Sequence, residues 1–600
     1  MRDEWNQPPG ASAPRSIPRS LRTILASFLV GVISIGVAWA GASLVPINDL
    51  SGDDSLTSTA KQSKTSKAPA TDRGFQDAIS FASLDEAGQI LAGAAKVSIE
   101  PKPEAYGGIW EQNKKKCTTL PPNEESFPAM ATHVADFRVR WAENSNCIYM
   151  GGYGIGPMNP IVSWDNEYGL WARSVAMSDG TDTVVLTLLD AVYWEGRYNS
   201  LCDACGFLDL ADQLATETGL KPESFIFAST HSHTSPDFIG GWGGVPSWYM
   251  DQVTDALKDS AKAAVASMKP AVLETGEVVA RQFNGERRDF YRSAEDDGVS
   301  WFRLVAADDL PKEETCVPGE PTPTEPTNQG NGNGYGNAGK ATPAPAPTPI
   351  CSPADPGTAI ATVGAYAAHP VTADESTGQA DADFPAVFAK RVEEAFGGTG
   401  MFLQTGLGNL SPRGDKVTMG NGLASLIPAI GTGEAVADPN VRVGRTGWNQ
   451  PVTNIPLGTL GVAGFFDRRF NQLPAAVREG KGPENRKCIS ASPVSVDTTV
   501  SAAKIGSLWI TGAPGEIFAN YSNTIEEGNP NGVTMALGLV NDGLGYIIQS
   551  FETDHVGRQA AGFVGKAGPV GIAEYEDAYS IDHCFGDAAL EKTLALLGTL

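Results

Sequence analysis

Long apolar runs alternate with amphipathic segments over most of the chain beyond Leu91. The run Thr183–Trp194 is apolar at nearly every position, which is typical of a strand buried on both faces. Residues Tyr249–Met268 repeat apolar side chains at i, i+3 and i+4, the spacing of one helix face. We therefore expect an α/β fold, with mixed β-sheets and flanking helices.

The same patterns predict the remaining principal elements. A second helix is expected over Asn199–Thr218, directly after the first long apolar run. Further strands are expected over Ser224–Ser229, Trp301–Ala306, Thr358–Ala367, Gly400–Gln404, Lys504–Thr511 and Thr534–Val540. No internal repeat interrupts this order, so we expect one large domain over residues 91–600.

Two polar stretches lack the periodicity of helices and strands. Residues 47–90 are rich in Ser, Thr, Lys and Asp and predict a disordered linker. Residues 317–350 are rich in Pro, Gly, Asn and Thr and predict a low-complexity insertion. Because Cys316 and Cys351 flank the insertion, a bridge between them would leave the surrounding domain continuous.

The N-terminal 46 residues predict export. Arg15, Arg19 and Arg22 precede the apolar stretch Thr23–Val45, and acidic residues follow it, so the positive-inside rule places the rest of the chain outside the cytoplasm. The stretch is long enough to span a bilayer, for which about 20 residues suffice. It also contains Ala38-Trp39-Ala40, a signal-peptidase pattern. A cleaved signal and a retained membrane anchor both stay open, and both are extracytoplasmic.

Charge and cysteine content narrow the function classes. The formal net charge of −26 repels phosphate backbones, so we exclude a nucleic-acid partner. Eight cysteines agree with an oxidising compartment. Sequence proximity pairs Cys117 with Cys147 and Cys316 with Cys351. Cys202 and Cys205 form a C-x-x-C pair, which leaves Cys488 for Cys584. For the C-x-x-C of Cys202 and Cys205, a structural disulfide is favoured over a redox motif or a zinc knuckle.

Candidate chemical groups gather where predicted strands end. Ligands in open α/β folds bind beyond the carboxyl ends of strands, and the candidates there are His231 and His233, His369, Ser411, Glu516 and Tyr546. Two histidines and a glutamate match a common catalytic zinc set, in which one position stays open for water. Each of these residues, taken alone, is more typical of a structural or solvated position than of a metal site.

The order of these segments resembles the neutral/alkaline, non-lysosomal ceramidases, which are zinc amidohydrolases. "THSHTSP", "AAHP", "GLGNLSP", "APGE" and "NDGLGYI" are similar to that family's motifs and follow in the same order. The opening glycine-rich segment "GYGIGPMNPI" is similar as well, and the resemblance spans about Lys96 to Asp587.

The resemblance implies a role for each matching residue. It implies one Zn²⁺ per chain, held by His231, His369, Glu516 and Tyr546. A cation lowers the pKa of a phenol by favouring its charged form, which explains a tyrosine ligand. The residues implied to contact substrate are Ser411, His233, Tyr575 and an arginine in "NGERRD", for which we choose Arg288 over Arg287.

Three features depart from the family pattern. Gly543 stands where the first tyrosine of the N-x-Y-x-x-Y segment is expected. The insertion 317–350 is unusual for the family. We also expect that the sequence up to Leu600 includes no immunoglobulin-like domain after the catalytic segment. Since that domain belongs to family members that hydrolyse ceramide, amide hydrolysis is the firmer expectation and ceramide the less firm one.

We therefore expect zinc-dependent hydrolysis of the N-acyl bond of ceramide or a related N-acyl lipid, which gives a fatty acid and an amine base. Bound zinc lowers the pKa of water toward about 7 and so supplies a nucleophile near neutral pH. One alternative is a metal-independent serine hydrolase, in which Ser411 is the nucleophile, a histidine is the base and an acid such as Asp190 or Asp415 supports it. A second is an exported, non-catalytic envelope-binding protein. The N-terminal apolar segment permits membrane association, and the sequence gives no oligomeric state.

Overall fold

The computed structural model describes the greater part of the predicted domain. The described residues are 88–102, 146–153, 159–199, 201–288, 294–310, 357–462, 466–471, 476–481, 487–552 and 575–600, with scattered residues between 108 and 142 and the pairs 316–317 and 350–351. The predicted N-terminal segment, nearly all of the linker and the interior of the insertion lie outside them. Within the described ranges, no helix combines the length and apolar character needed to cross a bilayer.

The larger sheet contains nine strands in the order β13-β11-β8-β6-β1-β3-β4-β5, with β15 paired to β6. The pairs β4–β5 and β11–β13 are parallel, and the other pairs are antiparallel. The prediction of a mixed sheet is thus confirmed. The strands are β1 (Gln89–Ser98), β3 (Trp171–Ser178), β4 (Thr183–Leu189), β5 (Phe225–Ser229), β6 (Lys269–Val279), β8 (Gly298–Ala306), β11 (Ala359–Tyr366), β13 (Thr399–Gln404) and β15 (Glu434–Ala435).

A second sheet has the order β16-β19-β20-β22, with only the last pair parallel. Its strands are β16 (Val441–Pro451), β19 (Ser495–Ile505), β20 (Leu508–Gly512) and β22 (Thr534–Leu537). Short two-stranded ladders join β2 (Ser163–Trp164) to β12 (Gln379–Ala380), β7 (Asn284–Glu286) to β14 (Leu410–Pro412), β9 (Cys316–Val317) to β10 (Ile350–Cys351), β17 (Ala476–Lys481) to β18 (Lys487–Ser492) and β21 (Glu516–Ile517) to β23 (Tyr546–Ile547).

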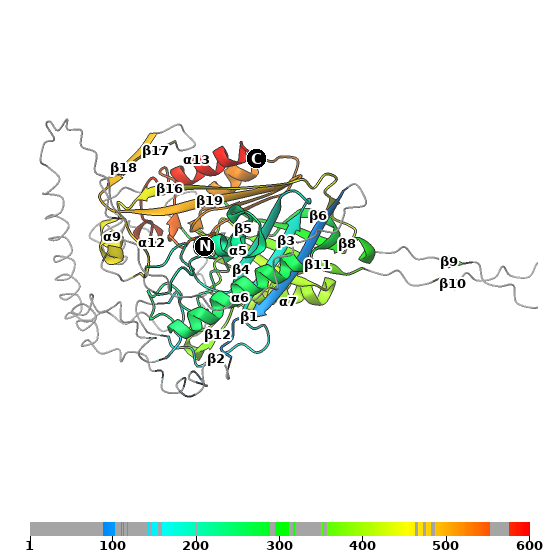
Figure 1. Ribbon diagram of the computed structural model, residues 1–600, viewed down its shortest axis with the longest axis horizontal. Helices are drawn as coiled ribbons and strands as arrows, with labels where there is room; N and C mark the ends of the chain where they lie inside the picture. Colours follow the sequence, from blue (N-terminus) through cyan, green and yellow to red (C-terminus); the bar gives the residue numbers. More distant parts are fainter. Residues whose placement is uncertain are drawn as a thin grey trace, which may run out of the picture.

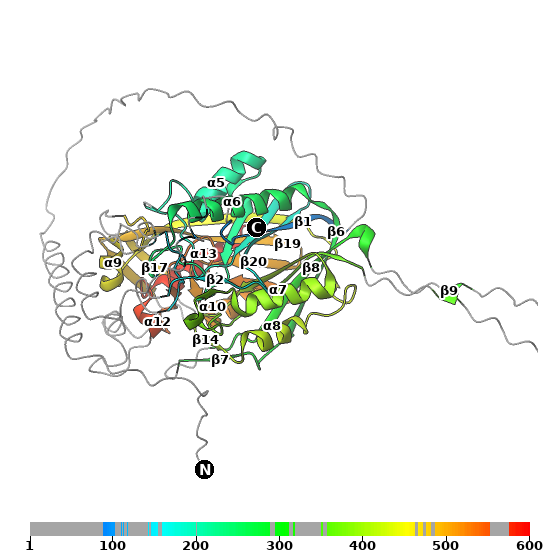
Figure 2. The ribbon, with the colours of Figure 1, turned by 90° about the horizontal axis from the view of Figure 1, so that it is seen from below.

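Helices cover the outer faces of both sheets. Alternate residues of β4 show why: Val185 and Leu189 pack in the core beneath α5 and α6, whereas Val184 and Leu186 pack against the second sheet. Helices α5 and α6 lie side by side, as do α7 and α8 (Figure 2). The helices are α5 (Phe207–Thr218), α6 (Ser247–Ala266), α7 (Asp383–Phe396), α8 (Lys416–Ala424), α9 (Ile455–Val462), α10 (Ala519–Glu526), α12 (Tyr575–Ala578), α13 (Phe585–Leu597) and the 3₁₀ turns η2 (Pro222–Ser224), η3 (Ala307–Asp309) and η4 (Glu375–Thr377).

The layers therefore run helices, large sheet, second sheet, helices. Apolar residues of both sheets, such as Leu304 and Ile510, share one buried cluster between them. Helix α13 packs on the outer face of the second sheet, where Phe585 joins Trp448 and Val500 in the core (Figure 1). In this arrangement the ends of β5, β11 and β20, which precede His231, His369 and Glu516, are buried inside the molecule.

Three predicted elements differ from the observed ones. The predicted strand Thr183–Trp194 ends as β4 at Leu189, and residues 190–194 lie beyond the strand. The predicted strand Lys504–Thr511 is a hairpin between β19 and β20, because Gly506 adopts a left-handed conformation (φ 57°) and reverses the chain. The predicted helix Asn199–Thr218 begins only at Phe207, since the preceding residues form a loop closed by a disulfide.

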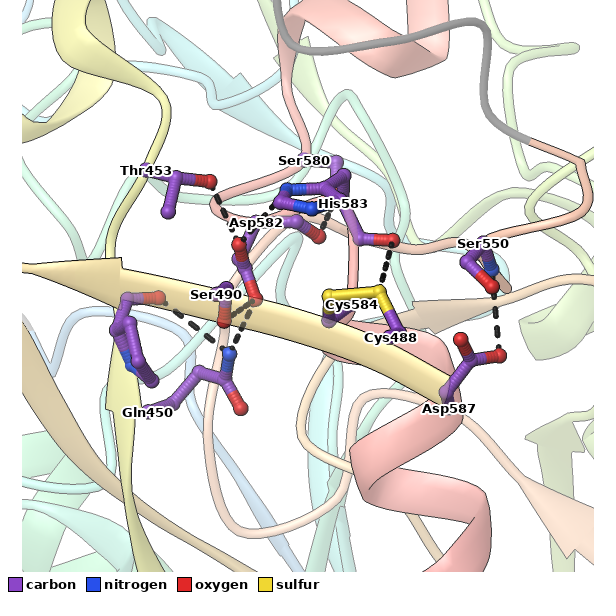
Figure 3. The surroundings of a disulfide bond; sticks show 11 residues. Gln450, Thr453, Cys488, Ser490, Ser550, Ser580, Asp582, His583, Cys584 and Asp587 are labelled. Atoms are coloured by element: carbon purple, nitrogen blue, oxygen red, sulfur yellow. Dashed lines mark hydrogen bonds and ion pairs between the residues drawn. A yellow bond between two sulfur atoms is a disulfide. The ribbon is translucent and has the colours of Figure 1, made fainter. Parts of the chain in front are cut away.

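Three of the predicted disulfides are confirmed, namely Cys117–Cys147, Cys202–Cys205 and Cys488–Cys584. The last ties β18 to the start of α13 (Figure 3). Beside it, the buried carboxylate of Asp582 accepts hydrogen bonds from Gln450, Thr453 and Ser490. Cys316 and Cys351 are opposite each other in the β9–β10 ladder, but their side chains lie outside the described set and their bridge stays a prediction.

Candidate metal centre

His231, His369 and Glu516 converge on one buried point, although they come from distant parts of the sequence. One ligand atom from each lies within 4.8 Å of the others, and all three residues are buried. The Oε2 atom of Glu516 is 2.9 Å from His369 Nε2 and 3.4 Å from His231 Nε2. The residues follow β5, β11 and β20, so the centre forms where strands of both sheets end.

The backbone orients both imidazole rings toward Glu516. Nδ1 of His231 is 3.0 Å from the carbonyl oxygen of Val192, and Nδ1 of His369 is 3.0 Å from that of Leu410. A carbonyl oxygen can only accept a hydrogen bond, so Nδ1 of each ring carries a proton, and in the neutral ring Nε2 presents a lone pair. Hydrogen bonds of this kind fix the tautomer of histidines that bind metal ions.

His231 lies in a strained backbone conformation. Its φ of 65° falls in the left-handed region, which bulky residues rarely adopt. Its amide donates to the carbonyl of Ala191 (2.8 Å), and the preceding Thr230 amide donates to Leu189 (3.0 Å). These bonds to the end of β4 hold the conformation, and such strain is concentrated at functional sites.

The electrostatics of the cluster favour an ionised Glu516 and a neutral His369. Burial alone raises the pKa of Glu516, but His231 and His369 hold that pKa well below its usual range. Burial lowers the pKa of His369 to about 4, Arg287 acts in the same direction, and Glu516 opposes both. Metal binding requires these same protonation states, because a proton on a ligand atom competes with the metal.

The donor set fits a divalent metal ion. Two imidazole nitrogens and one carboxylate oxygen converge, while Nδ1 of each histidine and Oε1 of Glu516 make hydrogen bonds elsewhere. This combination suits zinc and similar borderline metals. Cys488, His583 and Cys584 form a second group of ligand type. The two sulfurs of that group are joined in a disulfide, so the pair does not offer thiolates.

Tyr546 and Arg287 flank the cluster. Residue Glu516 pairs with Tyr546 in the parallel β21–β23 ladder, which brings the two side by side. The Tyr546 hydroxyl lies 3.5 Å from His369 Nε2, and Arg287 donates a hydrogen bond of 2.8 Å to it. Arg287 is in turn held by Glu576, 2.7 Å away, and by the carbonyl of Gly408. A cation beside a phenol favours its ionised form.

His233 lies next to His231. Its Nε2 is 3.3 Å from His231 Nε2. The pKa of His233 is well below its usual value, because burial and then the neighbouring His231 and His369 disfavour a second positive charge. A Cβ at Gly152 would lie 2.4 Å from the His233 ring, so only glycine leaves room for the imidazole in this position.

Ser411 and Tyr575 are each next in sequence to a residue that contacts the cluster or its arginine. Ser411 lies in β14, opposite Gly285 of β7, and directly follows Leu410, whose carbonyl holds His369. Tyr575 is the first residue of α12, and its side chain lies outside the described set. The next residue, Glu576, pairs with Arg287, which connects α12 to the cluster.

Of the two candidate arginines, the structure brings Arg287 to the cluster, and which of the two contacts substrate stays a prediction. The Arg288 side chain is fully buried and donates to Asp577 and to the carbonyl of Glu552, and its guanidinium stacks on Phe518. Arg287 instead bonds to Tyr546 at the cluster. Both guanidinium groups approach Glu576, at 2.7 Å for Arg287 and 4.0 Å for Arg288, so Glu576 joins the two arginines beside the cluster.

The two acids considered for a serine mechanism have structural roles. Asp190 is buried and accepts hydrogen bonds of 2.7 Å from Arg173 and from the amide of Trp171. Asp415 is exposed and caps α8 by accepting from the amides of Val417 and Thr418. Both carboxylates are thus occupied in holding β3 and α8.

Sequence reasoning missed residues that hold the site together. Asn541 exchanges hydrogen bonds with the backbone of Phe227 in β5, and its side chain also reaches Ser501. Asn409 accepts from the amide of Ala519, just after Glu516. Asparagines beside "DGLG" and "LSP" indicate turns, but the sequence pattern does not predict their hydrogen-bond partners. The hydroxyl of Tyr193 contacts Glu516, and its position inside an apolar run gave no sign of this.

Comparison with solved structures finds the same fold. The structure of neutral ceramidase from Pseudomonas aeruginosa matches with a TM-score of 0.52 and 15% identity, over 86% of this chain and 75% of that one. A ceramidase complexed with C2 matches with a TM-score of 0.48 and 15% identity, over 85% and 76%. No protein-family model and no curated protein matches the chain. The resemblance drawn from the motifs is thus confirmed for the fold.

Proposed function

We propose that this protein is a zinc-dependent amidohydrolase that cleaves the N-acyl bond of ceramide or a related N-acyl lipid. The observation that carries the proposal is the convergence of His231, His369 and Glu516 in a buried group suited to a metal ion. The fold supports it, because the similar chain of known structure is a neutral ceramidase.

One zinc ion would be held by His231, His369, Glu516 and Tyr546. When bound, zinc acts as a Lewis acid and lowers the pKa of water, so that a strong nucleophile is present near neutral pH. The two imidazoles and Glu516 are already arranged for this role. Tyr546 completes the set, since Arg287 beside its hydroxyl favours the phenolate that a metal binds.

Other side chains would act on the substrate. An amide carbonyl gains negative charge during hydrolysis and needs hydrogen-bond donors aimed at its oxygen. We assign this role to His233, which is adjacent to His231, and to Tyr575. Ser411 would bind the substrate amide or pass a proton to the leaving amine. Arg287 replaces Arg288 as the arginine beside the reacting group.

We also propose that the protein works outside the cytoplasm. The three described disulfides support an oxidising compartment. The predicted apolar stretch Thr23–Val45 would carry the chain across the membrane, whether or not it is later cleaved. A lipid amide substrate agrees with activity close to a membrane surface.

A hydrolysis assay tests the proposed function. Fatty acid and sphingosine released from a ceramide are measured before and after treatment with a metal chelator, and again after zinc is restored. We expect hydrolysis that chelation abolishes and zinc restores. His369→Ala should be inactive, whereas His583→Ala, which changes a histidine outside the cluster, should retain activity. Undiminished hydrolysis after complete removal of metal would overturn the proposal and favour the serine alternative.

A further inference from the structure

Tyr193 contacts the candidate metal centre from a side that the motifs do not reach. Its hydroxyl donates a hydrogen bond to Oε1 of Glu516. Its ring packs edge-on against His231, with ring centroids 4.9 Å apart. The side chain is only 8% exposed, so solvent does not compete strongly for the carboxylate. Tyr193 follows β4 by four residues, in the segment whose carbonyls also hold His231.

The two oxygens of Glu516 are therefore not equivalent. Oε2 faces Nε2 of His369 at 2.9 Å and Nε2 of His231 at 3.4 Å, whereas Oε1 is bound by Tyr193. A hydrogen bond to Oε1 restricts rotation of the carboxylate and directs Oε2 toward the point shared with the imidazoles. Hydrogen-bond partners of this kind orient metal ligands, and their loss typically weakens metal binding about 10–100-fold.

Gly543 provides the space that Tyr193 occupies. A Cβ at residue 543 would lie 2.9 Å from Cδ1 and 3.0 Å from Cβ of Tyr193, closer than carbon atoms normally approach. The backbone here has little freedom to yield, because the adjacent Asp542 is bound by Arg468 and by the amide of Gly196. The glycine that departs from the ceramidase pattern thus accompanies a tyrosine supplied by another segment.

We propose that Tyr193 is a positioning residue of the metal centre, whose hydroxyl holds Glu516 so that a single carboxylate oxygen faces the metal. The proposal rests on the metal site proposed above. It implies that the hydroxyl, rather than the ring, sets the affinity. It also implies that any side chain at residue 543 disturbs the centre by displacing the Tyr193 ring.

Metal binding by Tyr193→Phe tests the proposal. Affinity for Zn²⁺ is measured on chelator-stripped protein by competition with a chromophoric chelator, and the visible absorption spectrum is recorded after Co²⁺ substitution. We expect a Kd for Zn²⁺ about 10–100-fold higher than in the wild type, together with a changed Co²⁺ spectrum. Tyr521→Phe is the matched control, since this buried tyrosine bonds to Thr593. The control should leave both readouts unchanged.

A second variant addresses the space around the ring. Gly543→Ala keeps the hydroxyl of Tyr193 but crowds its ring, and we expect weaker zinc binding and a changed Co²⁺ spectrum here too. Wild-type affinity and spectrum in Tyr193→Phe would overturn the proposal while leaving the metal site intact. If the wild type binds no zinc, or His369→Ala binds it equally well, the proposed function itself fails.

Discussion

At the residue scale, Glu516 is the member of the cluster with the most partners. His231, His369 and Tyr193 all contact its carboxylate, which is 2% exposed. A buried charge of this kind is stable only when opposite charge or hydrogen bonds compensate it. We therefore attribute to Glu516 both the negative charge that attracts a cation and the geometry that the imidazoles share.

Glu516→Gln should reduce zinc content and turnover together. The amide keeps the shape of the side chain but removes its negative charge, so the affinity for a cation falls. Excess zinc should partly restore turnover if affinity alone is affected. Metal analysis and steady-state rates on the same preparations check this. Full turnover with no bound zinc would contradict the assignment of Glu516 as a ligand.

The metal-free protein should lose stability as the pH falls below about 6.5, the pKa of an unperturbed histidine. The folded pKa of His369 is lowered to about 4 by burial, so the unfolded chain binds a proton that the folded chain does not. Stability therefore rises with pH between about 4 and 6.5, and the full difference is on the order of 3 kcal/mol. His233, whose pKa is also lowered by burial, acts in the same direction.

Urea unfolding of the stripped protein at several pH values measures this slope. His369→Gln cannot bind the proton in either state, and it should therefore show a shallower dependence over the same range. Equal slopes for the variant and the wild type would show that His369 titrates normally in the folded protein.

At the element scale, the segment after β22 joins the strands that carry the site. Ser229 at the end of β5 donates to the carbonyl of Leu539, and the Gly538 amide donates to Gln404 at the end of β13. The amide of Leu539 donates to Gly515, next to Glu516. Backbone bonds from one short segment thus fix the ends of three strands relative to one another.

Two disulfides should differ in how much they stabilise the fold. Cys488 and Cys584 are separated by 96 positions and Cys202 and Cys205 by 3. In the chain-entropy model, closing the longer loop contributes about 4–5 kcal/mol to the free energy of unfolding and the shorter about 1–2 kcal/mol. The double alanine variant of each pair, compared by chemical denaturation, checks this. A greater loss from the Cys202–Cys205 variant would contradict the expected order.

The strands bearing candidate residues were predictable because their buried faces make continuous apolar runs. The sequence pattern predicted one strand over Lys504–Thr511 instead of a hairpin, because apolar residues on both sides of Gly506 and Ser507 continue the same pattern through the turn. Tyr193 was missed for a related reason. It lies inside an apolar run in which a tyrosine is an ordinary core residue, and its partner Glu516 is 323 positions away. Only the packing of the two sheets brings them together.

At the scale of the whole molecule, the layered packing accounts for a site assembled from distant segments. Gln404, the last residue of β13, donates to the carbonyl of Thr230 just after β5 (3.0 Å), so the first and last strands in the large sheet's order meet at these ends. The short β21–β23 ladder, whose strands follow β20 and β22 of the second sheet along the chain, brings Glu516 and Tyr546 to the same place. Each motif lies at or near the end of a strand that reaches this point, so motifs far apart in the sequence meet in one site.

The central claim is that His231, His369 and Glu516 hold a zinc ion. Anomalous diffraction at the zinc absorption edge, from crystals of protein loaded with one equivalent of zinc, tests it most directly. We expect one strong peak at about 2.0–2.2 Å from Nε2 of each histidine and from a carboxylate oxygen of Glu516. A peak elsewhere, or none at this cluster in crystals of zinc-loaded protein, would contradict the account.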